Sequence, residues 1–75
     1  MSKLLTVLIV EDHLGFAEGM ELLLLQHPKI EQVFIANTFE KALQELRNVS
    51  IDIVILDLHF ETDAYDGFII AKILA

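Results

Sequence analysis

"VILDLHF", residues Val54 to Phe60, places an aspartate at the end of an apolar run. Counting Ile53, four apolar residues precede Asp57, and a short run of this kind is typical of a buried strand. Ligand sites in open α/β sheets lie beyond the carboxyl ends of the strands. The stretch therefore predicts a buried strand with Asp57 at its mouth.

Composition limits what the rest of the chain can be. The 75 residues suffice for one small domain, and 55% of them are hydrophobic, which is rich for a chain of this size. Twelve acidic against five basic residues give a net charge of −7, so we expect no direct binding of nucleic acid by this segment. There is no cysteine, hence no disulfide or thiolate metal site. No segment has the pattern of a targeting or membrane-spanning sequence, so we expect a soluble, cytoplasmic protein without membrane contact.

Strands and helices are expected to alternate along the chain. The patterns predict strands at 6–10, 32–36 and 52–58, and helices at 14–26, from about 37 to 47, and from about 68 onward. Asn37, three residues before Glu40, is the expected cap of the second helix. The order β-α-β-α-β-α predicts an α/β fold with a parallel sheet. The last helix stops without a cap, and we expect that a C-terminal portion is missing.

Carboxylates follow two of the predicted strands. Glu11 and Asp12 end the first strand, and Asp57 ends the third. If the first strand is central, all three meet where the strand order reverses, and a divalent cation such as Mg²⁺ would relieve their repulsion. An aspartate held there can attack phosphorus and carry an acyl phosphate. The alternative is that these acids are merely solvated and that Asp12 caps the following helix.

These residues resemble the receiver domains of bacterial two-component response regulators. "VLIVEDH" is similar to their first strand with its metal-binding acids, and "DIVILDL" to the strand with the phosphoacceptor aspartate. The resemblance implies that residues 1–75 are a truncated receiver domain with an incomplete flavodoxin-like, doubly wound sheet. Its strand order would be 2-1-3, with the fourth and fifth strands absent. The start of the first helix is most similar to the subgroup whose outputs are helix-turn-helix domains that regulate transcription.

The same resemblance implies a function in signal transduction. A sensor histidine kinase would donate a phosphoryl group to Asp57, and Mg²⁺ would be held by Glu11, Asp12, Asp57 and the backbone carbonyl of His59. The protein would be no enzyme beyond its own phosphorylation and dephosphorylation. We expect His13 at the start of the first helix and the His59 side chain in solvent.

The sequence departs from the family pattern in ways that put phosphorylation in doubt. The hydroxyl residue and the lysine that contact the phosphoryl group in the family would both lie beyond Ala75, which impairs the reaction. In the loop after the phosphoacceptor, Glu61 stands where proline is usual, and Gly67 comes ten residues after Asp57.

Two other functions remain open. One is an interaction module that is not phosphorylated and binds a partner or itself. Because the third strand would lack its neighbour, we expect self-association through that open edge. The other is a Mg²⁺-dependent phosphohydrolase, which is disfavoured because no general acid or second catalytic acid follows Asp57 within its strand-end motif.

Overall fold

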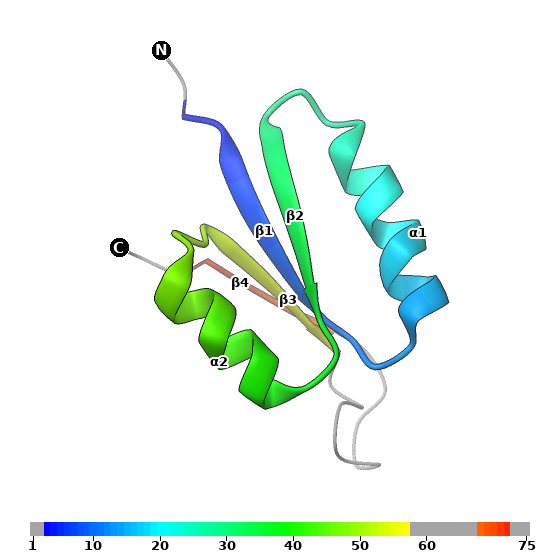
Figure 1. Cartoon of the computed structure of the whole chain (residues 1–75). Coiled ribbons are helices and arrows are strands. Elements are labelled where there is room, and N and C mark those ends of the chain that lie inside the picture. Colours follow the sequence, from blue (N-terminus) through cyan, green and yellow to red (C-terminus); the bar gives the residue numbers. More distant parts are fainter. Residues whose placement is uncertain (1–2, 58–67, 73–75) are drawn as a thin grey trace.

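The computed structural model describes residues 3–57 and 68–72, with side chains from 3 to 56. Six elements follow one another along the chain (Figure 1): β1 (Leu5–Val10), α1 (Leu14–Leu25), β2 (Ile30–Ala36), α2 (Phe39–Asn48), β3 (Ile53–Asp57) and β4 (Phe68–Lys72). The strands form one sheet in the order β2-β1-β3-β4. β1 runs parallel to both β2 and β3, which confirms the predicted α/β fold and the 2-1-3 order of an incomplete flavodoxin-like sheet.

The last element differs from the prediction. A helix was expected from about Phe68, but Phe68–Lys72 is a strand that pairs antiparallel with β3, with Asp57 opposite Phe68. A short apolar run such as "FIIA" fits a strand as well as a helix, and an unpaired β3 would leave its backbone donors and acceptors without partners. The expected open edge of β3 is therefore occupied by β4, and a fourth strand is present. The loop residues 58–67, with His59, Glu61 and Gly67, lie outside the described part of the chain.

The central strand β1 is covered on both faces, because the two helices lie on opposite sides of the sheet (Figure 1). Alternate β1 side chains therefore enter two separate apolar clusters. The cluster shared with α1 contains Val7, Ile9, Ala17 and Ile55, and the one shared with α2 contains Leu8, Val10, Ala36, Ala42 and Ile51. This two-sided burial explains why the strand has no polar residue between Val7 and Val10.

Helix α2 has a well-defined start, one residue later than predicted. The cap is Thr38, not Asn37: the Thr38 Oγ1 accepts a hydrogen bond from the Lys41 N–H at 3.1 Å. Glu40 in the first turn and Arg47 in the last turn suit the helix dipole. Helix α1 begins after His13, as expected, but the His13 side chain makes no capping hydrogen bond.

The first helix is apolar on most of its surface. Only Ala17 is buried in α1, with Met20 and Leu24 half-buried against the sheet. Five large apolar residues of α1 are exposed: Leu14, Phe16, Leu22, Leu23 and Leu25. Leu14, Ala17, Met20 and Leu24 are spaced along one side of α1; the first is exposed, the second is buried and the last two are half-buried.

Candidate functional site: the acidic end of the central strand

Glu11 directly continues the central strand. Its backbone N–H donates to the Ala36 carbonyl at 3.0 Å, which extends the pairing of β1 with β2 by one residue. This backbone bond fixes the residue, and only 2% of Glu11 is exposed. The structure therefore contains a buried carboxylate at the carboxyl edge of the sheet.

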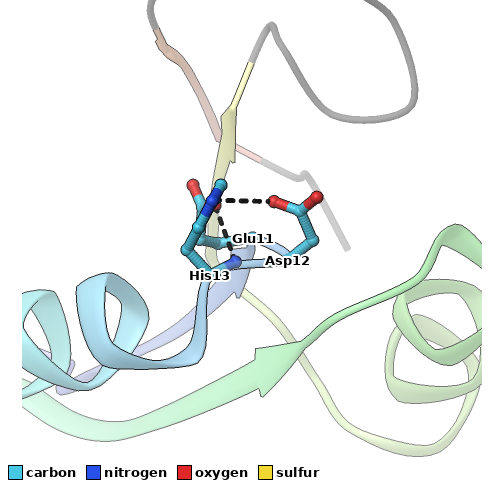
Figure 2. A network of polar contacts seen from close by, with 3 residues as sticks. All are labelled: Glu11, Asp12 and His13. Carbon is cyan, nitrogen blue, oxygen red and sulfur yellow. Dashed lines mark hydrogen bonds and ion pairs between the residues drawn. The ribbon is translucent and has the colours of Figure 1, made fainter.

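Asp12 and His13 complete a compact polar cluster above this edge (Figure 2). The Glu11 Oε1 accepts a hydrogen bond from the His13 backbone N–H at 3.0 Å and lies 3.2 Å from the His13 Nδ1. The same Nδ1 is 3.1 Å from the Asp12 Oδ1. The imidazole thus bridges a buried carboxylate and an exposed one.

The charge of this cluster acts on the histidine. The hydrogen bond to Glu11, together with the negative charges of Asp12 and Glu11, raises the pKa of His13 above its ordinary value of 6.5. The imidazole itself is largely in solvent, with 81% of the side chain exposed. It can therefore turn away from the carboxylates without disturbing the packed part of the protein.

Asp57 reaches the same edge of the sheet through the strand register. Val10 pairs with Leu56, so the next residues along the two parallel strands are Glu11 and Asp57. The structure thus places the backbone of Asp57 beside the acidic pair, although its side chain is outside the described part. His59 also lies outside it. Of the four ligands expected from the sequence, the structure therefore describes the side chains of Glu11 and Asp12.

The donor atoms of the cluster have the chemistry of a cation site. One ligand atom from each of Glu11, Asp12 and His13 lies within 4.8 Å of the others. Carboxylate oxygens suit Mg²⁺, Ca²⁺ and Mn²⁺, while imidazole is a ligand for transition metals. The three side chains together could therefore hold a metal ion.

The sequence pattern did not lead us to predict that His13 belongs to this cluster. It placed the residue only at the start of the helix. The signal was its position directly after two acids, because a turn between strand and helix folds the third residue back toward the first. Beside the cluster lies a shallow cavity of about 250 Å³, lined by Asp12, Leu14, Ile35, Asn37 and Lys41.

Comparison of the chain with models of protein families, with curated proteins and with solved structures finds no match. Within residues 3–57 and 68–72, neither helix has the length and apolar character needed to cross a membrane.

Proposed function

We propose that this protein is a phosphoacceptor module of two-component signal transduction, with Asp57 as the residue that accepts the phosphoryl group. One observation carries the proposal: a buried Glu11 and an exposed Asp12 end the central strand, and Asp57 occupies the next position of the neighbouring parallel strand. Three acids at one edge of a sheet suit chemistry on a phosphoryl group with a divalent cation.

The proposed reaction is one displacement at phosphorus. A carboxylate oxygen of Asp57 attacks the phosphorus of a phosphohistidine on a sensor kinase, the new O–P bond forms, and the P–N bond breaks. The kinase imidazole leaves with the electron pair of that bond and takes up a proton. The product is an acyl phosphate on Asp57, and its hydrolysis regenerates the carboxylate, so the protein processes no separate substrate.

Mg²⁺ is the proposed cofactor. Glu11, Asp12, Asp57 and the backbone carbonyl of His59 would hold it, and when bound it neutralises charge on the phosphoryl oxygens. The contribution of the chain is to fix Glu11 by its backbone hydrogen bond to Ala36, while Asp12 remains accessible from solvent. His13 competes for both carboxylates and has to release them.

The test is intact-mass spectrometry after incubation with Mg²⁺ and acetyl phosphate as the phosphodonor. We expect one added phosphoryl group on the wild-type chain and none on Asp57→Asn. Asp63→Asn is the matched control and should be phosphorylated like wild type. A folded wild-type sample without an adduct, or an adduct that persists in Asp57→Asn, would overturn the proposal.

A second candidate function is an interaction module that undergoes no phosphoryl transfer. Its support is the exposed apolar surface of α1, where Leu22 and Leu23 are 67% and 70% exposed. Such side chains in a small protein mark interaction surfaces. If the phosphodonor gives no adduct and Leu22→Lys with Leu23→Lys abolishes binding to a partner, this second function is favoured.

A further inference from the structure

The second face of the sheet carries an apolar groove beside helix α2. The groove has a volume of about 270 Å³, and the eight described residues that line it are all apolar: Leu8, Val10, Phe39, Ala42, Leu43, Leu46, Val54 and Leu56. β1 and β3 form the floor and α2 forms one wall. Helix α2 lies on the side of the sheet opposite α1 (Figure 1), so the groove that α2 lines is on that side too. None of the described residues that line it is acidic.

The wall of the groove is one continuous stripe of the helix. Phe39, Ala42, Leu43 and Leu46 follow the i, i+3, i+4, i+7 spacing that places side chains on one face. Ala42 is buried against the sheet, whereas Phe39 and Leu43 are 41% and 51% exposed. The sheet therefore covers only part of the apolar stripe. The outer part, with Phe39 and Leu43, faces the groove and solvent.

Two residues of opposite charge lie along the outer edge of this stripe, one near each end. Glu40 and Arg47 are seven residues apart, so they lie on the same side of α2, next to Leu43 at i+3 and i−4. Both are exposed. When two identical helices pair antiparallel about a two-fold axis, the same border of each helix lies on the same side of the contact. The N-terminal end of one helix then lies beside the C-terminal end of the other.

We propose that a second copy of this chain docks on the groove through its own α2. The two helices run antiparallel around a two-fold axis near Leu43. Leu43 then meets its counterpart, Phe39 meets Leu46 of the second copy, and Glu40 meets Arg47 at both ends of the contact. A two-fold interface uses the same patch on both subunits, and the charges of this patch are complementary to themselves.

Charge complementarity is the reason for choosing a second copy as the occupant. Each chain has a net charge of −7, so two copies repel one another at long range. An arrangement that places one acid opposite one base at each end of the contact offsets this repulsion locally. An antiparallel pairing shifted toward the N-terminal end of the helix would instead place Glu40 near Glu40.

Sedimentation equilibrium from micromolar to millimolar protein tests this proposal, in buffer without phosphodonor or Mg²⁺, so that its failure is distinct from failure of the phosphoacceptor function. We expect a reversible dimer. Leu43→Glu should abolish it, and Leu43→Lys provides a second variant in case the first does not fold. Leu4→Glu, at an exposed apolar position outside both helices, is the matched control and should leave the dimer unchanged.

Charge reversal provides the decisive measurement. Glu40→Arg or Arg47→Glu alone should weaken the dimer about tenfold, because each places like charges together at both ends of the contact. The double variant should restore the wild-type dissociation constant, although both substitutions oppose the helix dipole. A strictly monomeric chain, a dimer that survives Leu43→Glu and Leu43→Lys, or a double variant weaker than both single variants would overturn the proposal.

Discussion

The buried carboxylate of Asp52 accepts a hydrogen bond from the backbone N–H of Thr6 at 2.8 Å, and the Asp52 N–H donates to the Thr6 carbonyl at 2.9 Å. The two residues are 46 positions apart in the chain. Their reciprocal bonds join the start of β3 to the central strand. Asp52 also pairs with Lys3, which is 68% exposed. The end of the sheet opposite the candidate site is thus joined by a backbone hydrogen bond and by the buried side chain of Asp52.

Asp52→Ala should lower the free energy of unfolding by about 2 kcal/mol, because it leaves a buried backbone N–H without its charged acceptor. Urea denaturation followed by circular dichroism measures this loss. Lys3→Ala is the control, and should cost less than about 1 kcal/mol, since an exposed ion pair contributes little. Equal losses in the two variants would show that the ion pair, and not the bond to Thr6, joins the strands.

Thr38→Ala should destabilise the protein by about 1 kcal/mol through loss of the bond to the Lys41 N–H. Thr38→Ser keeps the acceptor oxygen and should retain most of the stability. Asn37→Ala tests the assignment of the cap, because the sequence pattern favoured that residue. A larger loss in Asn37→Ala than in Thr38→Ala, measured by thermal unfolding, would contradict the cap seen in the structure.

The imidazole of His13 should titrate above its ordinary pKa of 6.5, because the Glu11 and Asp12 carboxylates stabilise the protonated form. The folded-state pKa exceeds that of the unfolded chain, so this contribution to stability is fully present below the unfolded value. It is lost as the pH rises through the folded value. An NMR titration of the His13 ring, with the urea-unfolded chain as reference, measures the difference.

Glu11→Gln is the companion variant for this titration. It removes the carboxylate that accepts both His13 bonds, so the pKa of His13 should fall toward 6.5 while Asp12 still raises it in part. A His13 pKa that does not change in a folded Glu11→Gln protein would show that the histidine does not sense this carboxylate.

Mg²⁺ binding should strengthen by several-fold as the pH rises through the pKa of His13, since protonated imidazole and cation compete for Glu11 and Asp12. Isothermal titration calorimetry at a series of pH values measures the effect. His13→Asn should bind Mg²⁺ more tightly at low pH and flatten the pH dependence, and Asp12→Ala should lose binding. His27→Asn, a substitution far from the cluster, should behave as wild type; a flattened profile in that variant would contradict competition by His13.

Sequence patterns predicted the parallel part of the fold well, because two-sided burial restricts what the strands can contain. The stretches Val7–Val10 and Ile53–Leu56 contain no polar residue, and this signal requires a covered central sheet. The same apolar pattern predicts that Glu11 lies near Asp57, because two parallel strands of a covered sheet bring their carboxyl ends to one edge. The position of the acidic pair beside Asp57 could therefore be predicted before the structure was known.

Interactions set by neighbours in space were not predictable in the same way. The residues from Phe68 are compatible with helix and strand, and the choice depends on the backbone of β3, which a periodicity argument does not include. The bond from Thr6 to Asp52 depends on tertiary pairing across the sheet. His13 belongs to the acidic cluster through the turn after β1, a conformation that single-residue preferences do not specify.

The central position of β1 also affects the folding kinetics of the chain. β1 is the first strand along the sequence, yet it has to pair with β2 and, across two intervening helices, with β3. Closing those long loops costs chain entropy before any stabilising contact between the strands has formed. The helices α1 and α2, in contrast, need only local contacts. Folding should therefore be limited by the docking of β3 onto β1. Asp52, whose side chain bonds to Thr6 at the start of that contact, is then a natural place to probe the transition state.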